Sequence, residues 1–485
     1  MADGTYETVI GLEVHAQLAT RSKMFCGCPT TFGAPPNSET CPICLGMPGV
    51  LPVVNRAAVE YAVRAALAFG LRVNAACRFA RKHYYYPDMP KNFQISQYEE
   101  PLAEEGALEV DGPEGPRRIG IQRLHLEEDV GKLVHEGDFA TAQASLVDYN
   151  RAGTPLMETV SKPDIRSPEE AAAYLRAFRA VLLALGVCDG NMEEGSLRCD
   201  ANVSLRPRGA TELGTKVEIK NLNSFRNVQR ALEFEARRQA AALDKGERIV
   251  QETRLFDAER GVTQSMRSKE YAHDYRYFPE PDLVPLKLDP AWVKSIADGL
   301  PELPAARKQR LIRDYGLPPS DAALLSQSHA IAHYCDRAVR VHASNPKGIA
   351  NWITSEVLHQ VDADDEAAIT NFTISPENLG ALVGLIDNGT ISGKIAKDVF
   401  SRMLTSGEAP GEIVAREGLT QVKDAGTLEA FVDQAIAANP KAVADFKAGK
   451  TAASKAVVGQ VMKASGGKAN PAMVDKLVQE KLSKL

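Results

Sequence analysis

The sequence predicts an α+β fold, with a largely antiparallel sheet in the N-terminal part followed by two all-helical regions. Up to about residue 286, short segments alternate polar and apolar side chains between turn residues, which is typical of strands with one buried face. Beyond Asp289-Pro290 the alternation stops, and amphipathic segments such as 305–314 and 377–386 are separated by Gly, Pro and Asn. With 485 residues, 44% of them hydrophobic, the chain can fill two or three cores. We expect domains at 1–292, 293–406 and 407–485.

Three helices have clear start or stop signals. Ser167-Pro168-Glu169-Glu170 combines an N-cap, a first-turn proline and a capping-box glutamate, and an apolar stripe then runs to Leu185 before Gly186. A second helix is expected from about Ser224 to Asp244. Near the C-terminus, Asn470-Pro471 opens a helix whose apolar residues recur every three to four positions.

The first predicted strand, residues 9–18, has one polar face. Because side chains alternate between the faces of a strand, Glu13, His15 and Gln17 share one side while Leu12 and Val14 turn to the other. A neighbouring carboxylate and imidazole suit a metal ion. The commoner alternative for a lone His beside a Glu is a hydrogen-bonded structural role.

Later strands repeat the pattern. In segment 198–206 the alternate positions carry cationic or oxygen-bearing side chains, and segment 216–220 alternates Lys, Glu and Lys. Segments 124–129 and 155–158 add carboxylates. The acidic candidates outside the first strand are Glu127, Glu128, Glu158, Asp200 and Glu218.

Carboxylates that converge on one sheet face repel one another unless cations neutralise them, so such clusters commonly bind divalent ions. Oxygen-rich ligation favours Mg²⁺. The alternative is a sheet face whose charged residues form exposed salt bridges. The spacing of the residues alone does not distinguish this alternative from a metal site. Interleaved cations would clamp the oxygens of a transferring phosphate, and the candidates are Arg81, Lys82, Arg198, Arg206, Lys216 and Lys220.

Four of the eight cysteines form two close-spaced pairs, which can complete a tetrahedral thiolate site. Zinc is the favoured occupant, and an iron–sulfur cluster or four reduced thiols are the alternatives. Four protein ligands leave no open position for substrate, so the expected role is structural. The pairs are Cys26 with Cys28 and Cys41 with Cys44, while Cys77, Cys188, Cys199 and Cys335 are expected to be buried free thiols.

Charge and targeting signals limit the function classes. The net charge of −6 argues against a protein whose whole surface binds nucleic acid. Residues 441–485 nevertheless carry a net charge of +6, which fits either an RNA-facing arm or a solvated lysine-rich helical surface. No secretory signal or membrane-spanning run is evident, so we expect a cytoplasmic protein.

Nucleotide and amidase motifs are absent from the sequence. Segment 448–451 resembles the end of a P-loop, but Ala444 stands where that motif needs glycine. No Gly-x-Ser-x-Gly elbow or Gly/Ser-rich amidase stretch occurs. Use of ATP would therefore need a different kind of site, and a hydrolytic supply of ammonia would need another subunit. Two aromatic-basic runs, 81–88 and 274–282, suit either base stacking with phosphate contacts or packing in turns.

Long ordered strings of residues also carry a family resemblance. They include Val9-Ile-Gly-Leu-Glu-Val-His15, 86–88 with 94–97, 124–131, 145–156, 192–202, 218–225 and 274–282, and the region from about 295 onward adds 390–397. Together these strings resemble the B subunit of the glutamyl/aspartyl-tRNA amidotransferase over essentially the whole chain.

The resemblance implies a glutamine-synthetase-like antiparallel-sheet cradle at 1–292, a helical domain at 293–406 and a small α-helical, YqeY-like tRNA-binding tail at 407–485. It implies ATP-dependent amidation of misacylated Glu-tRNA(Gln), Asp-tRNA(Asn) or both. The cradle would phosphorylate the aminoacyl carboxylate, and ammonia channelled from an amidase A subunit would displace the phosphate. A small C subunit would complete a heterotrimer. The implied cofactors are ATP, Mg²⁺ and structural Zn²⁺.

The resemblance also implies residue roles. Its motif matches Glu128 rather than Glu127, where strand parity is ambiguous, and it matches the zinc ligands to Cys26, Cys28, Cys41 and Cys44. The implied catalytic positions are Glu13, His15, Glu128, Glu158, Asp200 and Glu218, of which all but Glu158 would bind magnesium; the implied phosphate or substrate contacts are Lys82, Tyr84, Arg198, Asn202 and Lys220.

Two other functions remain open from the sequence. One is a non-catalytic subunit that docks tRNA, and the other is a stand-alone carboxylate–amine ligase that uses free ammonia on a small molecule.

Overall fold

The computed structural model describes residues 5–112, 115–135, 144–268, 275–361, 365–420, 425–447, 450–465 and 469–484. Asp274 of the second aromatic-basic run and residues 448–449 of the P-loop-like segment lie outside these ranges. The chain forms two compact units, residues 1–307 and 308–485. All the named strands precede residue 288, and the named elements after it are helical, which confirms the predicted α+β class. Domain boundaries at 292/293 and 406/407 stay predictions.

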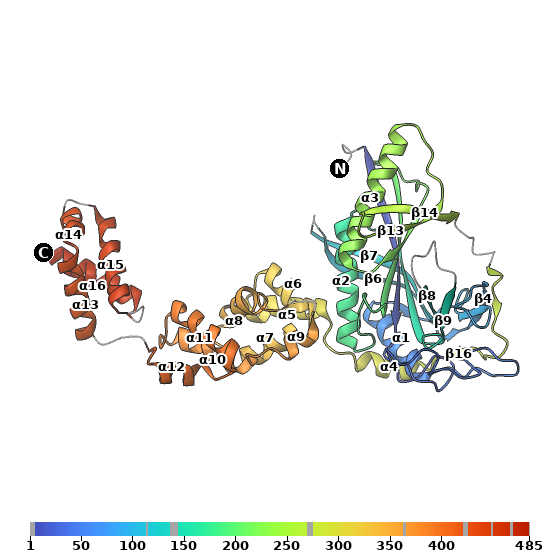
Figure 1. Cartoon of the computed structure of the whole chain (residues 1–485), viewed down its shortest axis with the longest axis horizontal. Coiled ribbons are helices and arrows are strands. Elements are labelled where there is room, and N and C mark those ends of the chain that lie inside the picture. Colours follow the sequence, from blue (N-terminus) through green and yellow to red (C-terminus); the bar gives the residue numbers. More distant parts are fainter. Residues whose placement is uncertain are drawn as a thin grey trace. The chain divides into compact units, whose positions relative to one another are not determined.

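A nine-stranded sheet is the centre of the first unit (Figure 1). Its strand order is β14-β13-β12-β11-β1-β10-β7-β6-β2, and every pair is antiparallel except β12 with β13. The strands are β1 (Tyr6–Gln17), β2 (Arg72–Val73), β6 (Ala103–Gly112), β7 (Gly115–Glu128), β10 (Pro155–Ser161), β11 (Leu197–Pro207), β12 (Val217–Leu222), β13 (Glu252–Asp257) and β14 (Val262–Ser268).

Smaller sheets surround this one. In the first of them, β4 (Ala80–His83) lies between β5 (Phe93–Ser96) and β15 (Phe278–Pro279). Two further pairs join β3 (Ala76–Cys77) to β16 (Leu286–Lys287) and β8 (Lys132–His135) to β9 (Ser145–Asp148).

Helices α2 (Pro168–Leu185) and α3 (Phe225–Asp244) lie along one face of the large sheet (Figure 1). Their limits confirm the sequence signals: the Ser167 hydroxyl caps α2, Ser224 caps α3, and Gly186 ends α2 with φ 64°. Helices α1 (Arg56–Ala68) and α4 (Pro290–Asp298) also lie in this unit.

The core of the first unit lies between the sheet and these helices. Leu12, Val14 and Ala201 are buried there, and Phe178 of α2 stacks on Phe69 with ring centroids 4.6 Å apart. Because strand side chains alternate, the residues between these core positions point to the opposite face of the sheet. That opposite face, which carries the polar candidates, is called the site face below.

The second unit contains two hydrophobic cores. One lies within residues 311–414 and the other within 428–482. Ile413 and Val414 of α12 belong to the first of these cores. The helices are α5 (Pro304–Tyr315, which begins in the first unit), α6 (Pro319–Gln327), α7 (His329–Val341), α8 (Pro346–Trp352) with a π-helical turn (Ile353–Val357), α9 (Glu366–Thr370), α10 (Pro376–Asp387), α11 (Gly393–Ser406), α12 (Pro410–Glu417), α13 (Ala425–Ala438), α14 (Pro440–Lys447), a 3₁₀ turn (Thr451–Ala453), α15 (Ser454–Ala464) and α16 (Pro471–Lys484).

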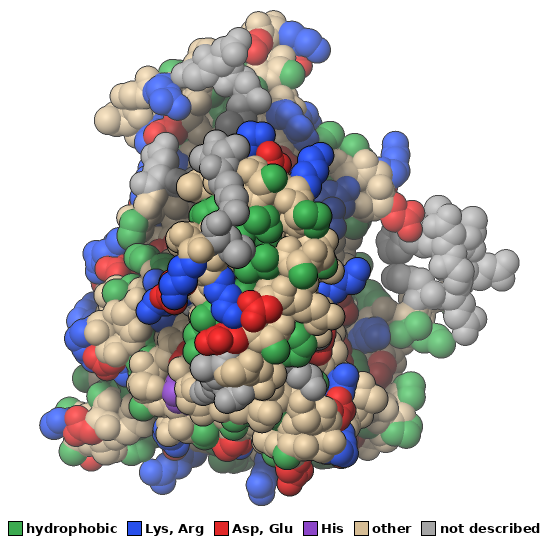
Figure 2. Space-filling model, turned by 90° about the vertical axis from the view of Figure 1, so that its left-hand side faces the viewer, with side chains coloured by type: hydrophobic (Ala, Val, Ile, Leu, Met, Phe, Trp, Pro, Cys, Tyr) green, Lys and Arg blue, Asp and Glu red, His purple; other side chains and the backbone are tan. Residues whose placement is uncertain are grey.

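Within the described ranges, no helix combines the length and apolar character required to span a membrane. On the face drawn in Figure 2, Lys and Arg side chains are interspersed with acidic and hydrophobic ones, so its coloured residues form no continuous basic surface.

Candidate active site

Strand register brings polar residues from distant parts of the chain together on the site face. On β1, Glu13 lies opposite Asp200 of β11, and His15 lies opposite Glu158 of β10. Residues directly opposite each other in an antiparallel pair point to the same face of the sheet, so the members of each pair lie side by side on the site face. Glu158 in turn lies opposite His125 of β7, and Asn202 lies opposite Glu218 of β12.

Two histidines and two glutamates form the first group, the imidazole–carboxylate cluster of His15, His125, Glu127 and Glu158. One oxygen of Glu158 lies 3.3 Å from Nε2 of His15 and 3.3 Å from Nε2 of His125. Glu127 lies 3.8 Å from each imidazole and accepts a hydrogen bond of 3.2 Å from the Ser96 hydroxyl. The ligand atoms of His15, Glu127 and Glu158 lie within 4.8 Å of one another, a spacing that one metal ion can bridge.

The charges in this cluster are strongly coupled. Burial by itself would lower the pKa of His15, but the carboxylates of Glu158, Glu127 and Asp200 outweigh it and raise that pKa to about 9. Burial acts in the opposite sense on Glu158, where the two imidazoles hold the carboxyl pKa well below its usual range. The Glu158 carboxylate is therefore ionised at neutral pH and attracts positive charge to this place.

A second group, the Glu13 cluster, lies beside the first and consists of Glu13, Asp200, Asn202, Glu218 and Lys220. The Asn202 amide donates to Glu13 at 2.9 Å, and the Lys220 ammonium donates to Asp200 at 2.5 Å. Lys220 also lies 3.8 Å from Glu218, whose other oxygen accepts a hydrogen bond of 2.7 Å from buried Thr253. Three carboxylates thus surround one lysine, which leaves net negative charge for a bound cation.

At the Gln17 end of the face, the side chains are already paired. Asp129 accepts hydrogen bonds from Arg198 at 2.8 Å and from Gln17 at 2.7 Å, and Arg151 lies 3.7 Å away. Burial alone would raise the pKa of Asp129, but Arg198 and Arg151 lower it. Arg198 is therefore held beside the clusters by a partner that sequence reasoning did not select.

The structure places Glu128 away from both clusters, contrary to the expectation from the family motif. Leu126 packs in the core, so strand alternation turns His125 and Glu127 to the site face and Glu128 away from it. The Glu128 carboxylate pairs with Lys91 and accepts a 2.9 Å hydrogen bond from the backbone N–H of Ile95. The apolar residues at 124 and 126, both fully buried, are the sequence signal that could have resolved the ambiguous parity in favour of His125 and Glu127.

Lys82 of β4 contributes a cation to the imidazole–carboxylate cluster. Burial would lower its pKa, but Glu127 and other nearby groups raise it. Its ammonium lies 5.1 Å from the ring centroid of Tyr275, and Tyr277 of the same run stacks on Tyr98 at 4.1 Å. Tyr84 is half-buried in the same region, and desolvation raises its pKa.

Two other expected phosphate clamps have protein partners. Arg81 donates to Glu280 at 2.7 and 2.9 Å, and its guanidinium lies 4.2 Å from the Phe93 ring centroid. Arg206 donates to Glu7 at 2.6 Å. Both arginines thus link their own strand to another segment of the chain through an ion pair.

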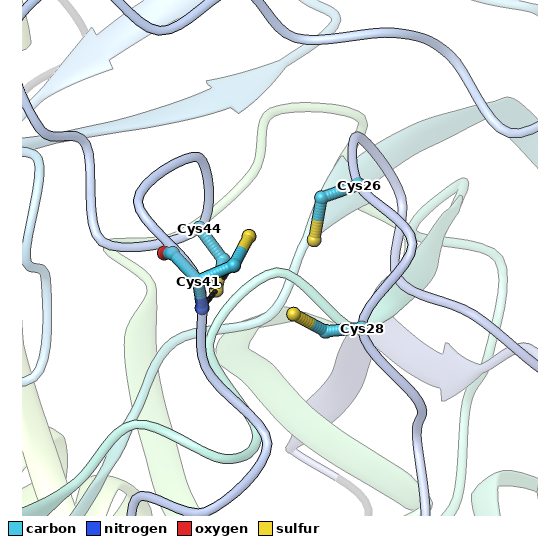
Figure 3. Close-up of side chains that lie close together, drawn as sticks. All are labelled: Cys26, Cys28, Cys41 and Cys44. Atoms are coloured by element: carbon cyan, nitrogen blue, oxygen red, sulfur yellow. Dashed lines mark hydrogen bonds between the residues drawn. The ribbon is translucent and has the colours of Figure 1, made fainter.

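The four cysteines expected to bind zinc point into one common space (Figure 3). Their sulfur atoms lie within 4.8 Å of one another, which suits the tetrahedral thiolate ligation of Zn²⁺. A hydrogen bond from Cys26 is the main reason why the pKa of Cys44 falls to about 4, and Lys23 also lowers it. The remaining cysteines are buried, as expected.

Comparison with known proteins agrees with this architecture. Residues 8–294 match the GatB/GatE catalytic domain, and residues 334–482 match the GatB domain. The B subunit of the aspartyl/glutamyl-tRNA(Asn/Gln) amidotransferase from Carboxydothermus hydrogenoformans is 55% identical over 480 residues, which cover 99% of each chain. The proteins of the same name from Moorella thermoacetica and Oleidesulfovibrio alaskensis are 54% and 53% identical over 477 residues, covering 98% of this chain and 100% and 99% of theirs.

The fold and site define one component of an amidotransferase, whose catalytic domain carries an ionisable cluster on one sheet face. The chain belongs to the family of B subunits of the aspartyl/glutamyl-tRNA(Asn/Gln) amidotransferases.

Proposed function

We propose that this chain catalyses the ATP-dependent step of tRNA-dependent amidation in the cytoplasm, on Glu-tRNA(Gln), Asp-tRNA(Asn) or both. The observation that carries the proposal is the convergence of five strands on the Glu13 and imidazole–carboxylate clusters. The proposal includes a glutamine-synthetase-like arrangement of the sheet. Such an arrangement would gather carboxylates on one face of the sheet.

The reaction needs an activated acyl group, because a carboxylate oxygen is a poor leaving group. An oxygen of the aminoacyl carboxylate attacks the γ-phosphorus of ATP, the bond to the β-phosphate oxygen breaks, and ADP leaves. Ammonia then attacks the carbonyl carbon of the acyl phosphate. The carbon–oxygen bond breaks, phosphate departs, and the proton lost by nitrogen ends on that phosphate, leaving the amide.

The residues of the chain bind and neutralise the reacting anions. Bound Mg²⁺ would supply charge neutralisation for the triphosphate and the acceptor carboxylate. His15, Glu127 and Glu158 would hold one ion, and Glu13, Asp200 and Glu218 supply oxygen atoms for another. Lys82 and Arg198 flank these groups, where they would orient phosphate oxygens.

The proposed assembly includes an amidase A subunit, a small C subunit and the tRNA. A separate amidase accords with the lack of amidase motifs in this sequence. The lysine-rich region after residue 441 would contact the tRNA backbone, and the four cysteines would hold a structural zinc ion.

The test uses the reconstituted complex with mischarged tRNA, glutamine and labelled ATP. ADP should form in step with amidated tRNA, and Asp200→Ala or Glu218→Ala should abolish both products. Glutaminase activity and tRNA affinity should change much less. Asp298→Ala, which removes an exposed carboxylate paired with Lys294, is the matched control.

Three results would count against the proposal. Equal loss of tRNA binding in both variants would mean that Asp200 and Glu218 hold the fold. Amidation without matching ADP formation would favour a docking role. Amide synthesis by the isolated chain without tRNA would indicate a stand-alone ligase.

A further inference from the structure

Strand β12 contains a β-bulge beside the Glu13 cluster. The register of β12 against β11 shifts by one residue between Ile219 and Leu222. Within that interval two residues of β12, Lys220 and Asn221, face a single residue of β11, Asp200. An extra residue of this kind bends its strand, and bulges are common next to active sites, where they redirect a side chain.

The burial of side chains along β12 shows what the bulge changes. Ile219 is buried in the core, so regular alternation would turn residue 221 to the core as well. Instead Asn221 is exposed and Leu222 is buried. The bulge therefore lets the core side of the strand resume at Leu222 while Lys220 stays on the site face.

The backbone of Asn221 has an unusual conformation that forms the bulge. Its φ angle is 67°, in the left-handed region that asparagine tolerates better than most other residues with a side chain. Its side-chain amide donates a 3.0 Å hydrogen bond to the backbone oxygen of Phe256. The pairing of β12 with β13 ends at Lys220 opposite Leu255, so this bond extends the connection between the strands by one residue. A strained residue that is fixed beside an ionisable cluster indicates a functional constraint.

Lys220 is the side chain that the bulge directs. Its ammonium donates to Asp200 at 2.5 Å and lies 3.8 Å from Glu218. A divalent ion at the Glu13 cluster would compete with this ammonium for the same oxygen atoms. Lys220 therefore limits how tightly the cluster binds a free ion, and a phosphate oxygen can replace a carboxylate as its partner.

We propose that Asn221 is a positioning residue: its left-handed backbone forms the bulge that holds the Lys220 ammonium on Asp200 and Glu218. Asn221 acts through Lys220 and needs no contact with substrate. The inference rests on the proposed function, since it concerns the cluster on which the ATP-dependent step depends. It adds that the ammonium of the protein and the bound ion compete for this cluster.

The test changes the backbone preference at residue 221 and leaves every charged side chain in place. Asn221→Val, in the reconstituted complex, should disfavour the positive φ angle and turn Lys220 away from Asp200. We expect ADP formation to fall by at least about tenfold. The affinity for Mn²⁺, titrated by electron paramagnetic resonance, should rise by about tenfold, because one cation leaves the cluster. Lys220→Met should raise the Mn²⁺ affinity by a similar factor.

A double-mutant cycle tests whether Asn221 acts through Lys220. Asn221→Val combined with Lys220→Met should bind Mn²⁺ like Lys220→Met alone, since both changes remove the same ammonium from the cluster. Asn221→Gly, which accepts a positive φ angle, should stay closer to the wild type than Asn221→Val. Glu105→Val is the matched control: Glu105 has a φ angle of 57° in β6 of the same sheet, so valine strains the backbone there without changing the Mn²⁺ affinity.

An unchanged or lower Mn²⁺ affinity in Asn221→Val would overturn the proposal, and so would additive effects of Asn221→Val and Lys220→Met. If melting shows that Asn221→Val does not fold, Asn221→Ala, which lacks the branched side chain, makes the same comparison. A wild-type complex that makes no ADP is a different result. It would defeat the proposed function, while the Mn²⁺ titrations would still test the role of Asn221.

Discussion

The site face and the cysteine cluster differ in how the fold assembles them. Glu13, His15 and Asp200 come together because strand register places them opposite one another on a rigid sheet. Cys26 and Cys44 lie in loops, outside any helix or strand, and their sulfur atoms point toward each other (Figure 3). We infer that the sheet would keep its oxygen ligands in place without a cation, whereas the loops depend on their metal for order.

The two sites also differ in what their ligands leave open. The four sulfur atoms can saturate a tetrahedral ion, so that ion has no position for substrate. Fewer protein ligands converge at His15, Glu127 and Glu158, so an ion there would keep positions for phosphate or carboxylate oxygens. The following predictions test this contrast between an open site and a closed one.

The largest expected effect is on catalysis at the open site. Glu158→Gln keeps the shape of the side chain but removes the charge shared by both imidazoles. ADP formation should fall by about 10³-fold or more, since the ion's contribution to the transition state is several kcal/mol. Single-turnover ADP assays measure this, with thermal melting to show that the sheet is intact. Retention of more than a tenth of the activity would remove Glu158 from the ligand set.

A second prediction separates Glu127 from Glu128. Glu127→Gln should weaken Mn²⁺ binding by about 10–100-fold, because it removes an ion-facing carboxylate. Glu128→Gln should leave Mn²⁺ affinity nearly unchanged, since that carboxylate pairs with Lys91. Electron paramagnetic resonance titration of free Mn²⁺ measures both affinities. The reverse ranking would show that the ligand set rearranges on metal binding.

Alternation along each strand was visible in the sequence, and the partners across strands were not. Glu13, His15 and Asp200 could be chosen because apolar neighbours mark the opposite face. The pairing of Arg81 with Glu280, 199 residues away, depends on tertiary register, which no local pattern specifies. The motif match selects Glu128 at a place where the parity of the strand is ambiguous in the sequence, and the burial of Leu124 and Leu126 in the structure resolves that parity in favour of Glu127.

The closed site should show its effect in stability. Cys44→Ser should release zinc and destabilise the first unit by about 2–3 kcal/mol, which corresponds to roughly 5–10 °C in melting temperature. Cys335→Ser is the matched control, since that thiol is buried in the 311–414 core. Metal analysis and calorimetry report both quantities. Full zinc content in Cys44→Ser would mean that three thiolates suffice.

The smallest effect is expected at a lysine beside the cysteines. Lys23 is fully buried, and its Nζ lies 2.8 Å from the backbone oxygen of Glu39 and 3.6 Å from Sγ of Cys44. Four thiolates around Zn²⁺ carry a net charge of −2, so one cation in contact with a sulfur atom should stabilise the loaded site.

Lys23→Met keeps the length of the side chain and removes that charge. Zinc affinity measured by chelator competition should fall by about tenfold, with the stoichiometry unchanged. Lys91→Met is the control, because Lys91 and Lys23 both border a cavity of about 200 Å³ next to Cys26 and Cys44, but Lys91 pairs with Glu128. Similar losses in both variants would point to a general charge effect. A loss confined to Lys23→Met would show that the closed site, like the open one, relies on a cation supplied by the protein.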